Sequence, residues 1–175
     1  MDMDNTRPGR ARNACLCRIQ QNSLRRRLGQ GVDSRGPPVV IDVVLDASLT
    51  LQWFLEDERD REYSLRILRS LSERRAIVPI LWFYEVGNGL LMAYRRKRIS
   101  FKQIDEFLMR LGRLPIDAAE QSPSDVLGLP AIARNHDLTN YDAAYLALAQ
   151  QLKLPLGTTD SALRKAAASA RITIA

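Results

Sequence analysis

The sequence predicts an α/β fold in which helices cover both faces of a parallel β-sheet. Short runs of β-branched and aliphatic residues alternate along the chain with longer segments whose apolar residues recur every three or four positions. The first run, Val39–Leu45, contains only one polar residue, Asp42. Such a run is typical of a strand that is buried on both faces, as strands of parallel sheets are. These observations together indicate an α/β domain.

The elements of the first half follow from their local patterns. Leu49–Leu55 and Glu62–Leu71 carry apolar residues at helical spacing, and Ala76–Val78 is a short second strand that ends before a proline. Helical spacing resumes from Ile80 to Tyr94. The run Arg95–Arg98 follows, and cations there stabilise the negative end of the helix dipole.

The second half repeats the alternation. Ser100 and Gln103 have the capping-box spacing, which begins a helix that reaches to about Leu111. The other expected elements are strands at Leu114–Ile116, Leu154–Thr158 and Ile172–Ile174 and helices at Ser124–His136, Thr139–Leu152 and Ser161–Ala170. Since ligands of parallel sheets bind at the carboxyl ends of the strands, residues that follow strands are the candidates for a site.

The first 38 residues differ from the rest of the chain. Residues 1–38 hold eight Arg and three Asp, lack apolar periodicity, and end in a stretch rich in Gly and Pro. We expect a disordered basic tail. It has three interpretations: a basic arm for nucleic acid, an Arg-rich organelle leader, or translated sequence upstream of the true start. We favour the last, because folded periodicity begins abruptly at Val39.

Composition narrows the class of protein. Residues 39–175 hold eighteen Lys or Arg and seventeen acids, so the net charge of +6 says little about the domain's ligand. Cys15 and Cys17 are the only cysteines, too few for a zinc site or a disulfide framework. No apolar run approaches the roughly 18 residues that a membrane span needs. We therefore expect a cytoplasmic protein with no membrane partner.

Four carboxylates lie where apolar segments meet helices. Asp46 follows the first strand, Asp142 lies at the start of the long Ala-rich helix, and Asp160 precedes the last helix. Each of these three also has an alternative role at a helix N-terminus, where Asp is favoured. Glu85 lies within Leu81–Val86, whose aromatic residues we expect to face the core. An ionised side chain there needs a partner, and a buried Arg is the alternative to a functional role.

Together, the four acids predict a metal site. Residues at strand ends and helix starts of a parallel sheet meet at one edge, so these side chains can converge. Like charges a few ångström apart repel by roughly several kcal/mol at reduced dielectric, which only cations can offset. Ligand sets made of oxygen alone select Mg²⁺ or Mn²⁺ over softer metals.

Elimination points to phosphodiester hydrolysis. His136 is the only histidine, so the chain lacks the second imidazole of metal-free RNA cleavage. The domain also lacks a nucleophile elbow, a core cysteine and a glycine-rich phosphate loop. Attack by metal-activated water on a phosphodiester remains.

Several stretches of the sequence, taken together, resemble PIN-domain ribonucleases and, within them, the VapC-type toxins of toxin–antitoxin modules. The matching stretches are Val43–Ser48, Trp53–Leu55, Tyr84–Asn88, Leu138–Leu146 and Thr158–Leu163. Their order and spacing cover nearly all of residues 41–175. The resemblance implies a PIN-like three-layer sandwich over residues 39–175 with a central parallel sheet of four to five strands.

The resemblance also implies a site and an activity. One or two Mg²⁺ or Mn²⁺ ions would be held by the catalytic acids Asp46, Glu85, Asp142 and Asp160. Asp46 and Asp142 would be the principal ligands, and the supporting polar residues would be Ser48, Asn88 and Thr158. The enzyme would cleave RNA endonucleolytically, leaving a 5′-phosphate and a 3′-hydroxyl. It would form a homodimer, and a cognate antitoxin would silence it by covering the cleft.

Substrate and partner contacts have alternatives. Arg164 and Lys165 follow Asp160 on the same helix and are candidates for RNA phosphate contact, with a solvated helix face as the alternative. An exposed subset of the aromatic residues would form the antitoxin groove, with the core as their alternative place: Trp53, Phe54, Trp82 and Phe83. Two other functions stay open: an RNA-processing nuclease of the PIN fold without an antitoxin, and a non-catalytic metal-dependent adhesion module, suggested by Asp46–Thr50.

Overall fold

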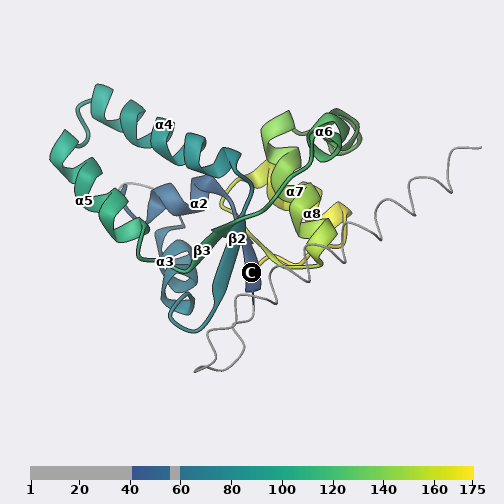
Figure 1. Ribbon diagram of the computed structural model, residues 1–175, viewed down its shortest axis with the longest axis horizontal. Coiled ribbons are helices and arrows are strands. Elements are labelled where there is room, and N and C mark those ends of the chain that lie inside the picture. Colours follow the sequence, from purple (N-terminus) through teal and green to yellow (C-terminus); the bar gives the residue numbers. More distant parts are fainter. Residues whose placement is uncertain (1–40, 56–59) are drawn as a thin grey trace, which may run out of the picture. The chain divides into compact units, whose positions relative to one another are not determined.

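The structure is a computed structural model that describes residues 41–55 and 60–175, so the tail expected at residues 1–38 lies outside the described residues. Figure 1 shows helices on both sides of a small central sheet. The strands are β1 (Ile41–Leu45), β2 (Arg75–Val78), β3 (Ile116–Ala118) and β4 (Leu156–Gly157). The described helices are α2 (Ala47–Gln52), α3 (Arg61–Ser70), α4 (Leu81–Arg95), α5 (Phe101–Leu111), α6 (Pro123–His136), α7 (Asn140–Leu152) and α8 (Ser161–Ser169).

The sheet is parallel throughout and has the strand order β3-β2-β1-β4. Val44 of the central strand β1 is in register with Ile77 on one side and Leu156 on the other. Helices α2 to α5 lie on one side of the sheet and α6 to α8 on the other (Figure 1). The sequence prediction of an α/β fold with a covered parallel sheet is therefore confirmed, with four strands.

Prolines account for the differences in strand boundaries. The strand expected at Leu114–Ile116 begins only at Ile116, because Pro115 has no N–H and contributes just its carbonyl, 2.9 Å from the Ala76 nitrogen. The strand expected at Leu154–Thr158 is reduced to Leu156–Gly157, directly after Pro155. The strand expected at Ile172–Ile174 is wrong: it is a single parallel bridge between Ile174 and Leu156, because β4 offers it only two residues.

Two helices begin at capping boxes. In α5, the backbone N–H of Gln103 donates to Ser100 Oγ at 3.3 Å, and Ser100 N–H donates to Gln103 Oε1 at 2.9 Å, as the sequence predicts. Helix α6 starts earlier than expected, with Ser122 as N-cap and Pro123 in the first turn, a position that suits proline. Within the described part of the chain, no helix is both long and apolar enough to cross a membrane.

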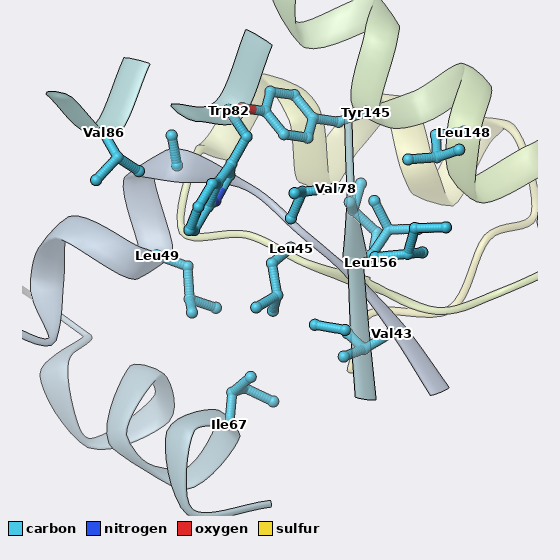
Figure 2. Close-up of a cluster of buried hydrophobic side chains, with 14 of the residues drawn as sticks. Val43, Leu45, Leu49, Ile67, Val78, Trp82, Val86, Tyr145, Leu148 and Leu156 are labelled. Atoms are coloured by element: carbon cyan, nitrogen blue, oxygen red, sulfur yellow. The ribbon is translucent and has the colours of Figure 1, made fainter. Parts of the chain in front are cut away.

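Most helices and strands contribute at least one side chain to the core. Figure 2 shows Leu45 of β1, Leu49 of α2, Trp82 of α4 and Tyr145 of α7 around one cluster, and all four are at most 1% exposed. Helices α2 and α4 approach so closely that a Cβ added at Gly89 would lie 2.4 Å from Leu51 Cδ1. This contact brings the helix that follows β1 next to the helix that follows β2.

Candidate active site

Asp46 stands directly after β1, at the carboxyl edge of the sheet, and is 5% exposed. Its backbone is in the N-cap position of α2, yet its side chain makes no capping hydrogen bond. Instead, Oδ2 accepts hydrogen bonds from Thr158 Oγ1 at 2.7 Å and from Ser48 Oγ. Asp46 is therefore the N-cap residue of α2 by position, as its alternative role predicts, but its carboxylate is held mainly by two hydroxyls.

The electrostatic surroundings of Asp46 disfavour its charge. Burial raises the pKa of this carboxyl, hydrogen bonds from Ser48 and Thr158 lower it in part, and the charge of Asp142 raises it again. A buried carboxylate with such neighbours is more stable when a cation is nearby. Asp46 therefore has the properties expected of a metal ligand.

Glu85 is half-buried in the second turn of α4, and its partner is a tyrosine. The hydroxyl of Tyr145 donates a hydrogen bond to Glu85 Oε2. Among residues 41–55 and 60–175, no arginine pairs with Glu85, which is where the alternative of a buried arginine fails. Burial raises the pKa of Glu85, the hydrogen bond from Tyr145 lowers it, and the charges of Asp46 and Asp142 raise it.

The aromatic residues before Glu85 do not all face the core. Trp82 is 1% exposed, whereas Phe83 and Tyr84 are 46% and 74% exposed. Because a helix turns about 100° per residue, neighbours of Trp82 in sequence lie on a different face. Of the four aromatic residues expected at a partner groove, Trp53 and Trp82 are buried, Phe54 is partly buried, and Phe83 is exposed.

Tyr145 is a site residue that the sequence did not reveal. It is fully buried in α7, three residues after Asp142, so both side chains lie on the same side of that helix. Burial, followed by the hydrogen bond to Glu85, raises the pKa of Tyr145 far above its ordinary value, so the phenol keeps its proton and donates. The sequence signal for this role was one tyrosine, whose hydroxyl is polar, on the buried face of an Ala-rich helix.

Asp142 combines a capping role with proximity to the other acids. Thr139 is the N-cap of α7: its Oγ1 accepts from the Asp142 N–H at 3.1 Å and donates to Asp142 Oδ2 at 2.6 Å. The alternative role of Asp142 in the N-terminal capping of this helix is thus observed. Its charge nevertheless acts on both Asp46 and Glu85, so the three acids are within electrostatic reach of one another.

Asp160 is tied to Asp46 through Thr158. Its Oδ1 caps α8 by accepting from the Leu163 N–H at 2.7 Å, so the capping alternative is again observed. Its own N–H donates to Thr158 Oγ1 at 3.0 Å, the same hydroxyl that donates to Asp46. Within the described residues, Asp160 is not among the charges that raise the pKa of Asp46 or Glu85. Electrostatic interactions therefore couple three of the acids, and the Thr158 hydroxyl connects the fourth to Asp46.

Two of the three expected supporting residues contact the acids. Ser48 and Thr158 both bind Asp46 Oδ2, and Ser48 Oγ also lies 3.0 Å from Thr159 Oγ1. Asn88 is exposed, one turn after Glu85 on α4. Support of Asp46 by hydroxyls therefore has a structural basis, whereas a role for Asn88 stays a prediction.

The two basic candidates are placed differently. Arg164 Nε donates to the Thr158 carbonyl at 2.9 Å, and its guanidinium lies 5.0 Å from the ring centre of Tyr63, which Arg66 faces from 5.4 Å. Lys165 is exposed. A cavity of about 580 Å³ beside this stack is lined by residues of α3 and its N-cap: Asp60, Arg61, Glu62, Tyr63, Arg66 and Arg69.

The donors present fit a hard divalent cation by charge and type. The charged side chains that shift the pKa of Asp46 and Glu85, as far as the structure describes the chain, are all acids. Carboxylates and hydroxyls are the donors that Mg²⁺ and Mn²⁺ prefer. Across residues 41–55 and 60–175, however, no three acidic, His or Cys side chains are close enough to hold an ion as they stand. Each acid is instead turned to a hydroxyl or backbone donor, so binding through fewer carboxylates and water is the arrangement that fits.

Comparison with known proteins assigns the fold to a family. The family model described as PIN domain matches residues 43–169, more than half of the chain. The solved structure of PAE2754 from Pyrobaculum aerophilum is 21% identical, with a TM-score of 0.58, over 73% of this chain and 87% of that chain. The structure of FitAcB from Neisseria gonorrhoeae is 15% identical, with a TM-score of 0.50, over 75% of this chain and 95% of that chain. No curated protein matches significantly.

Proposed function

This chain belongs to the PIN-domain family, and on that premise we propose that it is a divalent-metal-dependent endoribonuclease that acts as the toxin of a toxin–antitoxin pair. PIN domains are generally nucleases, so hydrolysis of nucleic acid is the activity that the family brings. The observation that supports the proposal most is the electrostatic coupling of three acids: Asp142 disfavours the charge of Asp46, and Asp46 and Asp142 both disfavour the charge of Glu85.

The metal chemistry is assigned to specific residues. Asp46 and Asp142 are the principal ligands in this proposal, and Glu85 and Asp160 complete the site or orient the attacking water. When bound, Mg²⁺ or Mn²⁺ supplies positive charge to the phosphodiester and lowers the pKa of water. Thr158 and Ser48 orient the Asp46 carboxylate, because both hydroxyls bind its Oδ2.

RNA binding rests on cations near the acids. Lys165 is exposed on α8, directly after Arg164, whose guanidinium is held by the Thr158 carbonyl and the Tyr63 ring. The cavity beside this ring adds Arg61, Arg66 and Arg69 of α3, against the two acids Asp60 and Glu62 in the same lining. Cations of this kind position a nucleic-acid backbone without reading its sequence. Cleavage is proposed to leave a 5′-phosphate and a 3′-hydroxyl.

A protein partner is supported by exposed apolar side chains on α4 and α5. Tyr94 and Phe101 contact each other edge to face at 5.8 Å between ring centres, and both are exposed. The other exposed members are Phe83, Leu91, Leu108 and Met109. Contiguous exposed apolar side chains mark interaction surfaces, and the Tyr94–Phe101 pair is contiguous in this sense. We assign the cognate antitoxin and the second copy of a homodimer as the partners of this protein.

Asp46→Asn tests the proposed chemistry, because Asn keeps the size and the hydroxyl contacts and removes the charge. Total RNA is incubated with the wild type and the variant, with Mg²⁺ and with EDTA, and the new 5′ ends are mapped for a phosphate. We expect Mg²⁺-dependent cuts by the wild type and none by Asp46→Asn. Cutting by the variant, or equal cutting in EDTA, would rule out the mechanism.

A further inference from the structure

Tyr145 makes a contact that the proposed chemistry does not yet use. Its ring is 0% exposed within the core, and Figure 2 shows its oxygen directed towards the helix that carries Trp82, which is α4. The hydroxyl donates to Oε2 of Glu85 on that helix. A bond across 60 residues of sequence thus joins α7 to a carboxylate of the site.

Packing alone does not require the hydroxyl. A phenylalanine would fill nearly the same volume in the core, and a buried hydroxyl without a partner is costly. Glu85, for its part, is only half-buried, so water can satisfy its oxygens. The hydroxyl also has a backbone hydrogen bond with Ala47, so the fold gains from it at the start of α2, but that contact does not explain its bond to Glu85.

Repulsion within the site gives that explanation. The charges of Asp46 and Asp142 both act against the charge of Glu85. A half-exposed glutamate has several rotamers, and repulsion favours those that carry its carboxylate towards water. The hydrogen bond from Tyr145 opposes this rotation. Helix α7 therefore carries both Asp142 and, three residues on, the donor that retains Glu85.

We propose that Tyr145 is a positioning residue that holds the Glu85 carboxylate beside Asp46 and Asp142, and thereby strengthens binding of a divalent cation. This inference rests on the proposed function, because it takes Glu85 to be part of a cation site. Hydrogen bonds from neighbouring residues to a ligating carboxylate orient it, and their removal typically weakens metal binding by about 10- to 100-fold.

The test measures Mn²⁺ binding to the full chain by isothermal titration calorimetry, so that it does not depend on RNA cleavage. Tyr145→Phe removes the hydroxyl and keeps the ring. Tyr141→Phe is the matched control, because it makes the same chemical change one turn earlier on α7, where the side chain is 64% exposed. We expect the dissociation constant for Mn²⁺ to rise about 10- to 100-fold in Tyr145→Phe and to stay within about twofold of the wild type in Tyr141→Phe.

A double-mutant cycle tests whether Tyr145 acts through Glu85. In a Glu85→Gln background, the carboxylate that Tyr145 holds is gone, so adding Tyr145→Phe is expected to change Mn²⁺ affinity by less than about twofold. An undiminished effect of Tyr145→Phe in that background would overturn the inference. So would loss of the cooperative thermal transition in metal-free Tyr145→Phe, because the hydroxyl would then serve the fold.

The outcomes separate this inference from the function on which it rests. If the wild type binds Mn²⁺ and Tyr145→Phe binds it equally well, the positioning role is overturned and the metal site stands. If the wild type binds no Mn²⁺, both the metal-dependent function and the inference are overturned.

Discussion

The close approach of α2 to α4 predicts opposite effects for the same substitution at two glycines of α4. Gly87 is exposed, and a Cβ there would meet nothing within 4 Å. Gly87→Ala should therefore stabilise the fold by about 1 kcal/mol, the difference in helix propensity. A Cβ at Gly89 would lie 2.4 Å and 2.9 Å from the two terminal carbons of Leu51. Overpacking of this kind costs about 1 to 3 kcal/mol, so Gly89→Ala should be destabilising by up to about 2 kcal/mol after the same gain in propensity.

The difference between the two variants isolates the packing term, because the gain in propensity is common to both. For a domain of this size, 1 kcal/mol corresponds to roughly 3 to 4 °C in Tm, so a packing term of about 1 to 3 kcal/mol should separate the variants by roughly 3 to 12 °C. Thermal unfolding followed by circular dichroism in metal-free buffer measures this. Gly89→Ala should also lower RNA cleavage, since α2 begins directly after Asp46. Equal Tm values for the two variants would show that Leu51 moves aside for the added methyl group at no cost, and would refute the reasoning.

Two further predictions concern Asp46. Burial raises its pKa in the fold, so its contribution to stability is fully present below the ordinary value of 3.8 and is lost as the pH rises through the folded value. Metal-free Asp46→Asn should therefore have a higher Tm than the wild type at pH 7, with a gap that narrows towards pH 4; a gap of constant size would contradict this. Thr158→Val removes the 2.7 Å bond to Asp46, and should destabilise the fold by about 2 kcal/mol and weaken Mn²⁺ binding about tenfold. Calorimetry measures the Mn²⁺ affinity and melting curves measure the stability, with Thr173→Val at an exposed threonine as the control. Equal losses of affinity and stability in the two variants would contradict the prediction.

The fold was predictable because its elements depend on local patterns. The buried strand before Asp46 and the capping box at Ser100 each identify an element without reference to the rest of the chain. The errors lie where pairing across the sheet decides the outcome. The segment at Ile172–Ile174 has the composition of a strand, but whether it becomes one depends on β4, which has two residues to offer. A pattern of β-branched residues does not contain that information.

For the site as well, positions along the chain could be predicted from the sequence, whereas the orientation of side chains in space could not. The four acids were candidates because charged residues at the ends of apolar segments, or within one as Glu85 is, are unusual wherever they point. What holds them was only partly identifiable: Ser48 and Thr158 lie beside acids in sequence, whereas Tyr145 reaches Glu85 from another helix. In an Ala-rich helix a tyrosine is expected to be core, and its ring is core. Only the direction of one hydroxyl, set by the packing of α7 against β1 and towards α4, distinguishes a residue that fills the core from one that orients a carboxylate. Substitutions that keep the ring and remove the hydroxyl are therefore the way to test such positions.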